Sequence, residues 1–146
     1  MPRPEYLAEL WRLDGLSELL RQSDAVVVTV PLTPATQGML GAEQLALMKP
    51  SAYLIGISRG GIIDERALVR LLKEGRPAGA GLDVFELEPP PPESDVWETP
   101  HLVITPQCSG VSRQTTDGCW QVLKENLGRY LEGQPLLNVF DKRRGY

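Results

Sequence analysis

The feature that most constrains the fold is a regular alternation of short apolar runs with segments of helical periodicity. The first run is β-branched and continuous, as expected for a strand buried on both faces, whereas two glycines weaken the third and suggest a close backbone approach. The runs are residues 25–30, 52–57, 78–84 and 102–105. Strands that alternate with helices indicate βαβ units, so the sequence predicts an α/β fold with a parallel sheet covered on both faces.

Helix signals fill the segments between these runs. Residues 16–22 follow Asp14, a candidate N-cap, and residues 65–74 follow a second candidate, Asp64. Residues 42–48 form a shorter helical segment that ends before a proline. These helical segments alternate with the strands along the chain.

The last predicted helix, residues 112–131, is the longest. Its apolar residues recur at the spacing of a stripe that faces a core. They are Trp120, Leu123, Leu127, Tyr130 and Leu131. We therefore expect this helix to pack on the rest of the chain and to end at Gly133.

Composition narrows the classes of function. The 146 residues carry a net charge of -4, which disfavours binding to nucleic acid or to an anionic membrane. There is no apolar run of membrane-spanning length and no apolar signal region after Met1, so we expect a cytoplasmic protein. Cys108 and Cys119 form no C-x-x-C pair, which predicts free thiols and no metal site.

Dinucleotide folds place the pyrophosphate on a G-x-G-x-x-G loop at a helix N-terminus. This sequence contains no such loop: Gly79-Ala-Gly81 is followed by Leu-Asp-Val, and Gly60-Gly61 lacks the spacing. The acidic residue expected about 20 positions further on is missing with it. This chain by itself is therefore not expected to bind a pyrophosphate.

Several ordered segments resemble the D-isomer-specific 2-hydroxyacid dehydrogenases. SDAVVVTVPLTPAT at 23–36 resembles the SD-strand-PLTPET segment of that family, and MKPSAYLIGISRGG at 48–61 resembles its MKPGA-strand-ARGG signature. AGAGLDVFELEP at 78–89 resembles AGAALDVFxxEP, and LVITP at 102–106 resembles VLITPH. Residues 125–139 contain elements of the closing helix and tail, so the resemblance spans about residues 16–140.

The resemblance implies the second half of a Rossmann-like, doubly wound parallel sheet with a long C-terminal helix. The family sheet has the order 3-2-1-4-5-6-7, and the four runs correspond to strands 4 to 7, so one wall of the cofactor crevice is expected. We predict a single incomplete NAD-binding domain over residues 1–146. Residues 1–15 form an extension, 16–111 the βα units, and 112–146 the long helix and tail.

With strand 1 of the family sheet missing, strand 25–30 is expected to be an apolar edge, and such edges are usually covered. The candidates are residues 1–15, with Leu10, Trp11 and Leu13 as the nearest local cover, a swapped segment, a homodimer partner, or a partner that supplies the missing segments. The sequence leaves these alternatives open.

The resemblance also implies roles at the strand ends. Arg59 matches the arginine that binds the substrate carboxylate and polarises its carbonyl, and Glu88 matches the glutamate that pairs with the catalytic histidine. Gln107 stands where the family has that histidine, and an amide cannot exchange a proton at neutral pH. His101 precedes strand 102–105, roughly 20 Å from position 107, and cannot substitute.

NAD or NADP is the cofactor that the resemblance implies. Asp83 matches the aspartate that binds the nicotinamide carboxamide; the alternative is a carboxylate that caps a turn. Gly56 replaces a common asparagine, which questions the hydrogen bonding around Arg59. The cofactor contacts are expected at Val30, Ile57, Ser58, Arg59, Asp83, Gln107 and Ser109.

Two functions follow. The first is the NAD(H)-binding portion of an oxidoreductase that transfers hydride between nicotinamide and a small 2-hydroxy or 2-keto acid, inactive or weak alone because of Gln107 and the missing loop. The second is a catalytically dead oligomerisation or partner-binding module on the same fold.

Overall fold

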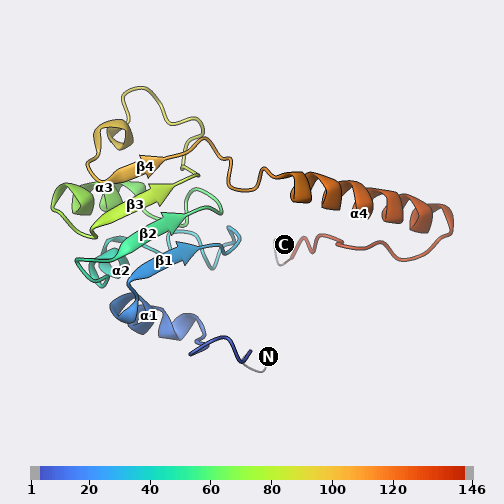
Figure 1. The fold of residues 1–146 in the computed structure, drawn as a ribbon, viewed down its shortest axis with the longest axis horizontal. Coiled ribbons are helices and arrows are strands. Elements are labelled where there is room, and N and C mark those ends of the chain that lie inside the picture. Colours follow the sequence, from blue (N-terminus) through green and yellow to red (C-terminus); the bar gives the residue numbers. More distant parts are fainter. Residues whose placement is uncertain (1–3, 144–146) are drawn as a thin grey trace.

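The sheet is the frame of the molecule. The structure, a computed structural model, describes residues 4–143, and its four parallel strands lie in the order β1-β2-β3-β4 (Figure 1). The strands are β1 (Ala25–Val28), β2 (Tyr53–Gly56), β3 (Gly79–Leu82) and β4 (Leu102–Ile104). Each neighbouring pair is in parallel register. The predicted α/β fold with four parallel strands is confirmed.

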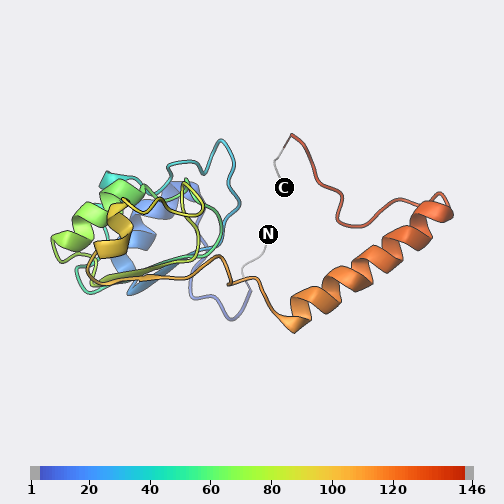
Figure 2. The same cartoon turned by 90° about the horizontal axis from the view of Figure 1, so that it is seen from above.

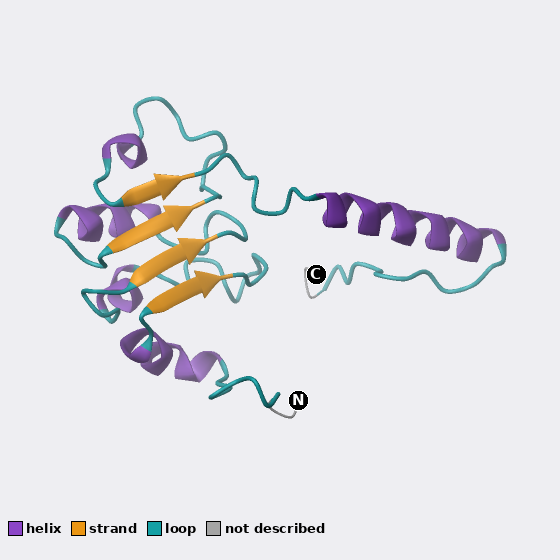
Figure 3. Cartoon of the chain, viewed as in Figure 1, coloured by secondary structure: helices purple, strands orange, loops and turns teal. Residues whose placement is uncertain are grey.

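Helices alternate with the strands along the chain as the sequence predicts, one before β1 and two in the strand connections (Figure 3). They are α1 (Leu16–Gln22), α2 (Ala42–Ala46) and α3 (Glu65–Lys73), with short 3-10 turns at Leu13–Gly15 and Asp95–Glu98. The Asp64 carboxylate caps α3 by accepting a hydrogen bond of 2.9 Å from the Ala67 N–H. The predicted Asp14 cap is wrong, because Asp14 lies inside the first 3-10 turn and Gly15 takes the N-cap position of α1.

Only one face of the sheet is covered in the described residues, so the prediction of two covered faces is wrong. All three strand connections run in the same direction across the sheet, and right-handed crossovers then place the connecting helices α2 and α3 on the same side (Figure 2). The core forms between that side and the helices. It includes Leu20, Val26, Val28, Leu45, Leu54, Leu68, Leu72, Ala80 and Leu82.

The opposite face of the sheet, which we call the bare face, has no helix on it (Figure 2). Strand alternation places on it Ala25, Val27, Tyr53, Ile55, Gly81 and Val103. Three of these side chains are large, apolar and exposed: Val27, Tyr53 and Val103. The continuous apolar character of the strands therefore reflects a second surface that the described chain leaves open to solvent.

The long helix α4 (Arg113–Leu131) forms as predicted, with Ser112 as its N-cap, but it packs on no core. It projects away from the sheet (Figure 1), and none of its residues is buried. The expected core stripe from Trp120 to Leu131 is exposed. The spacing predicted the helix correctly, but its predicted packing on the core is wrong, because an apolar stripe does not specify which surface it faces.

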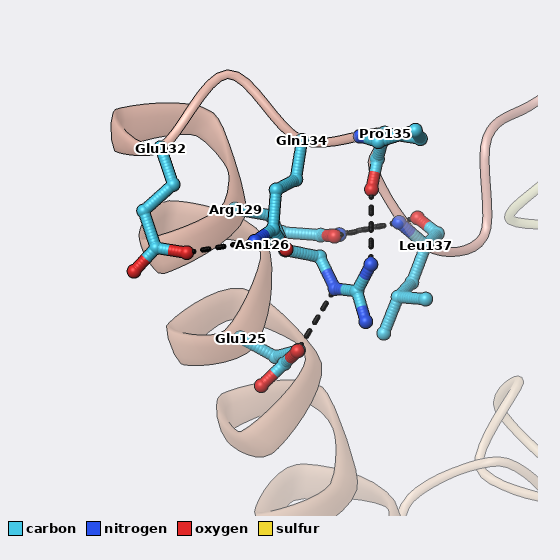
Figure 4. A network of polar contacts seen from close by, with 7 residues as sticks. All are labelled: Glu125, Asn126, Arg129, Glu132, Gln134, Pro135 and Leu137. Atoms are coloured by element: carbon cyan, nitrogen blue, oxygen red, sulfur yellow. Dashed lines mark hydrogen bonds and ion pairs between the residues drawn. The ribbon is translucent and has the colours of Figure 1, made fainter.

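The tail after α4 turns back along that helix (Figure 4). Asn126 exchanges two hydrogen bonds with the backbone of Leu137, at 2.7 and 3.1 Å. The Arg129 guanidinium donates one hydrogen bond of 2.8 Å to the Glu125 carboxylate and another of 3.2 Å to the Pro135 carbonyl. These side-chain bonds return the chain toward the sheet.

The edge of β1 is not covered by the local segment that the sequence suggested. In the described residues β1 pairs with β2 alone, and Leu10 and Leu13 remain exposed. Trp11 instead packs against Gly15, at the start of α1. Among residues 4–143, no helix combines the length and the apolar character needed to cross a bilayer.

Candidate functional site

A cavity of about 610 Å³ lies at the carboxyl ends of β1 and β2. Open α/β sheets bind their ligands at this edge, and the volume lies within the usual range for small-molecule sites. Residues that follow the two strands line it, together with one residue from the tail. They are Thr29, Val30, Pro31, Leu32, Ile57, Ser58, Arg59 and Phe140.

Two polar groups in this cavity have no strong partner. The Arg59 guanidinium donates to the carbonyl of Ser58 at 2.8 Å, and no carboxylate oxygen of the described residues lies within 4 Å of it. The Ser58 hydroxyl is buried, and no group within residues 4–143 hydrogen-bonds to it. A buried hydroxyl without a partner is costly, so these groups fit a site that is completed by a polar, anionic ligand.

Glycines fix the loop that presents Arg59. A Cβ at Gly60 would lie 1.8 Å from the Phe85 carbonyl oxygen, and Gly61 has a φ of +81°. Gly56 lies on the covered face of β2, where a Cβ would come within 2.9 Å of the side chains of Ile63 and Leu82. Glycine at position 56 therefore makes room for the core, and its effect is on packing rather than on the hydrogen bonds of Arg59.

Asp83 holds the chain segment that follows β4. Its side chain is only 3% exposed, and it accepts hydrogen bonds from the Thr105 hydroxyl, from the Cys108 N–H at 2.9 Å and from the Ser109 N–H at 2.8 Å. The Ser109 hydroxyl in turn contacts the Ile57 carbonyl at 3.4 Å. We call this set the Asp83 clamp. It corresponds to the turn-capping alternative, while contact between Asp83 and a cofactor stays a prediction.

Hydrogen bonds from Ser109 and Thr105 hold the pKa of Asp83 well below its ordinary value. A carboxyl group whose pKa is lower in the folded state stabilises the fold above its unfolded pKa, about 3.9, and this contribution is lost as the pH falls toward the folded pKa. We expect acidification from pH 6 to pH 3 to lower the unfolding free energy more in the wild type than in Asp83→Asn. Urea titrations at both pH values measure this difference, and equal losses would contradict it.

The clamp also predicts which backbone amides lose protection from hydrogen exchange when Asp83 is replaced. In Asp83→Asn the amides of Cys108 and Ser109 lose their charged acceptor, so their hydrogen exchange at pH 6 is expected to accelerate by about ten- to a hundredfold. The amide of Ala67, which Asp64 caps, serves as the internal reference.

Glu88 and Gln107 do not line the cavity. Glu88 accepts a hydrogen bond of 3.0 Å from the Phe85 N–H within its own turn. Gln107 is exposed, with a φ of +50°, and follows the carboxyl end of β4. His101 precedes β4 at the opposite end of that strand, as predicted.

The structure thus brings some of the expected site residues together and leaves others apart. Four of them share the cavity: Val30, Ile57, Ser58 and Arg59. Asp83 and Ser109 adjoin it through the clamp. Both cysteines are exposed free thiols, and the described residues contain no cluster able to hold a metal ion.

Sequence patterns missed Phe140. It reaches the cavity from the tail, far from the motifs at the strand ends, because Asn126 and Arg129 fold the tail back. The amide of Asn126 is the single signal, since a side chain of this type near a helix end can bond to a returning backbone.

A second feature that the sequence did not indicate is a cavity of about 810 Å³ between α3 and residues 86–96. Glu65 lies on its wall and accepts a hydrogen bond from the Glu86 N–H, and burial raises the pKa of Glu65. Lys73 and Asp95 form an ion pair of 2.8 Å across the same groove. The walls carry mixed charge, so they indicate no single class of ligand.

Comparison with known proteins agrees with this geometry. The sequence profile described as "D-isomer specific 2-hydroxyacid dehydrogenase, NAD binding domain" matches residues 2–109. The chain is 43% identical over 119 residues to glyoxylate reductase from Korarchaeum cryptofilum, covering 82% of this chain and 36% of that protein. It is 42% identical over 127 residues to glycerate dehydrogenase from Methylorubrum extorquens, covering 84% and 40%. It therefore spans well under half the length of these relatives.

Solved structures give the same result. The chain superposes with a TM-score of 0.82 on a D-isomer specific 2-hydroxyacid dehydrogenase from Xanthobacter autotrophicus Py2 in complex with NADPH and MES, at 40% identity over 92% of this chain and 55% of that one. It also superposes with a TM-score of 0.82 on an NADPH-dependent glyoxylate/hydroxypyruvate reductase from Sinorhizobium meliloti in complex with NADP and sulfate, at 32% identity over 93% and 44%.

Proposed function

The chain belongs to the D-isomer specific 2-hydroxyacid dehydrogenase family, and from this membership we propose that it is the NAD(P)-binding portion of an oxidoreductase acting on small 2-hydroxy or 2-keto acids. The observation that supports this most is the cavity at the carboxyl ends of β1 and β2, which holds the Arg59 guanidinium and a buried Ser58 hydroxyl that no group within residues 4–143 hydrogen-bonds to. A dinucleotide and a carboxylate substrate are both anionic and suit this pair.

Each residue then has a definite task. A bound nicotinamide supplies or receives the hydride. Arg59 binds the substrate carboxylate with its forked donors and polarises the adjacent carbonyl. Val30, Ile57 and the buried Ser58 hydroxyl hold the cofactor, and the Asp83 clamp keeps residues 105–109 at the edge of the site.

Gln107 limits this chemistry. Its amide can donate and accept hydrogen bonds but cannot give or take a proton at neutral pH, and Glu88 is bonded within its own turn. General acid–base catalysis contributes typically about 10²–10⁴-fold to a rate. We therefore propose that the site binds its ligands and that its turnover is impaired.

The relatives suggest which ligands to use. Their names specify glyoxylate reductase and glycerate dehydrogenase, and two of the solved structures hold NADPH or NADP. We propose NAD(P) as the cofactor and a two- or three-carbon 2-keto acid as the substrate.

A second function has support of its own. Gln107 removes the proton-transfer group, and both the bare face and the stripe of α4 are exposed apolar surfaces. A partner-binding module on the same fold would keep these exposed apolar surfaces and would bind neither the cofactor nor the substrate.

An NMR titration distinguishes the two functions. The titration uses the longest natural polypeptide that contains this chain, because the chain itself has no pyrophosphate-binding loop. Adding NADPH to the ¹⁵N-labelled protein is expected to shift the amides of residues 29–32 and 57–59, and adding oxalate, a carboxylate probe, is expected to shift those of 57–60. Arg59→Gln should abolish the response to oxalate, whereas Arg113→Gln, on the exposed surface of α4, should leave it unchanged.

Shifts confined to the groove between α3 and residues 86–96, or no shifts at millimolar ligand, would contradict the proposed oxidoreductase site. They would favour the partner-binding module.

A further inference from the structure

We propose that Glu65 is a positioning residue of the candidate site, because its carboxylate holds the turn of residues 85–88 against the loop that carries Arg59. Glu65 does not itself line the cavity beside Arg59. It acts on that cavity through the backbone of the neighbouring turn. The inference rests on the proposed function only for the ligand that Arg59 binds.

The turn after β3 is held through two successive backbone amides, and each of them donates a hydrogen bond to a carboxylate. The Phe85 N–H donates to Glu88 at 3.0 Å, which is a bond within the turn. The Glu86 N–H donates to Glu65, which belongs to a different element. The first bond therefore shapes the turn, and the second ties the turn to α3.

Glu65 is well fixed because it is the first residue of α3. The preceding residue, Asp64, caps this helix through the bond that it accepts from the Ala67 N–H at 2.9 Å. The helix also packs on the core through five buried side chains, which are Ala67, Leu68, Val69, Leu71 and Leu72. A carboxylate on such a rigid element can hold a neighbouring turn in a defined place.

The loop of Arg59 rests on the same stretch of backbone. A Cβ on Gly60 would lie 1.8 Å from the Phe85 carbonyl oxygen and 2.7 Å from the Glu86 nitrogen. That nitrogen carries the N–H that donates to Glu65. The loop and the turn therefore meet at the amide that Glu65 holds, and release of this amide would remove the support of the loop.

Arg59 needs this support because its side chain has few bonds of its own. The guanidinium donates to the carbonyl of the adjacent residue, Ser58, at 2.8 Å. No carboxylate oxygen of residues 4–143 lies within 4 Å of it. A side chain without a carboxylate partner takes its position mainly from the backbone that carries it.

The charge of Glu65 does not serve the stability of the fold. Burial raises the pKa of Glu65, the bond from the Glu86 N–H opposes this rise, and the charges of Glu86 and Glu88 reinforce it. When folding raises the pKa of a carboxyl group, the ionised form is disfavoured in the fold, so its charge lowers stability near neutral pH. Glutamine keeps an oxygen acceptor without the charge, so Glu65→Gln is expected to be at least as stable as the wild type.

Three variants separate positioning from stability in the longest natural polypeptide that contains this chain. Glu65→Ala removes the acceptor of the Glu86 N–H, and Glu65→Gln retains one. Asp64→Ala removes the comparable bond one residue earlier, which ends on Ala67 instead of the turn. It weakens the start of α3 without releasing the Glu86 amide, so it controls for a general loss of stability. Urea unfolding compares the stabilities of the three proteins.

The first measurement needs no ligand. In Glu65→Ala we expect hydrogen exchange at the Glu86 amide to accelerate by about ten- to a hundredfold, and the amide resonances of Arg59 and Gly60 to shift. In Asp64→Ala and Glu65→Gln the exchange rate should stay within about threefold of the wild type. If Glu65→Ala leaves the exchange at Glu86 unchanged, or accelerates it without moving the resonances of Arg59 and Gly60, the proposal is wrong.

The second measurement is an NMR titration with oxalate. Glu65→Ala should raise the dissociation constant for oxalate by about tenfold, because the guanidinium of Arg59 is displaced from the geometry that binds a carboxylate. Glu65→Gln and Asp64→Ala should change it by less than about threefold. Equal weakening by Asp64→Ala and Glu65→Ala would indicate a merely structural role and would overturn the proposal.

The two measurements also separate this inference from the proposed function. If oxalate binds to none of the proteins, the wild type included, the proposed function fails. The exchange at Glu86 and the resonances of Arg59 and Gly60 then still decide whether Glu65 positions the loop.

Discussion

Replacing Gly60 by alanine is expected to destabilise the protein by about 3 kcal/mol, the upper range for overpacking. The added Cβ would lie 1.8 Å from the Phe85 carbonyl oxygen and 2.7 Å from the Glu86 nitrogen. Both contacts are with backbone, so no side-chain rotation can relieve them. The loop that carries Arg59 must separate from the turn after β3, and the cavity loses its wall. Urea unfolding of both proteins measures the difference.

Gly118→Ala is the matched control. Gly118 lies inside α4, and nothing lies within 4 Å of the position that its Cβ would take. Alanine there should leave stability unchanged or raise it by about 0.5–1 kcal/mol, because glycine is unfavourable in a helix interior. A Gly60→Ala protein as stable as Gly118→Ala would show that the loop is not held against residues 85 and 86.

Replacing Gln107 by histidine is expected to raise the rate of NADPH-dependent reduction of glyoxylate by about 10²–10⁴-fold, as far as the proposed function holds. Imidazole can transfer the proton that an amide cannot. Position 107 has a φ of +50°, a region that histidine enters more readily than most residues, so the change should be tolerated. The rate is followed by the absorbance of the reduced cofactor, in the longest natural polypeptide that contains this chain.

Gln107→Asn provides the control, because it changes the side chain without adding a group that titrates near neutral pH. If histidine and asparagine both leave the rate at background while NADPH still binds, a missing proton donor does not explain the lack of turnover. The partner-binding module would then be favoured.

Local patterns predicted the elements of the fold because each element depends on nearby residues. The short apolar runs predicted all four strands, each of which is one to three residues shorter than its run, and Asp64 predicted the start of α3, where it accepts a hydrogen bond from the N–H three residues on. Strand order followed from the family resemblance.

Arrangement in space was predicted less well. The stripe from Trp120 to Leu131 indicated a core helix, and the structure leaves it exposed. The apolar strands indicated two covered faces, and the single direction of the crossovers covers one. In both cases the hydrophobicity of a residue indicates that its burial is favourable, but it does not indicate which surface buries it.

The site divides in the same way. Val30, Ile57, Ser58 and Arg59 follow two neighbouring parallel strands, so one cavity was predictable from the strand ends alone. For Asp83 the sequence left two roles open, a cofactor contact, which stays a prediction, and a turn cap. Its bonds to Thr105, Cys108 and Ser109 could be assigned only from the path of the chain after β4. Phe140 depends on a tail held by Asn126 and lies beyond any local pattern.

Because the tail turns back after α4, it connects that helix to the cavity beside Arg59. Phe140 lines the cavity, and the same segment is bonded to α4 through Asn126 and Arg129. A molecule that binds beside Arg59 therefore lies next to a segment that is hydrogen-bonded to the long helix α4. By thermodynamic reciprocity, any factor by which an occupant of the exposed face of α4 alters the affinity for that molecule is also the factor by which the molecule alters the affinity for that occupant.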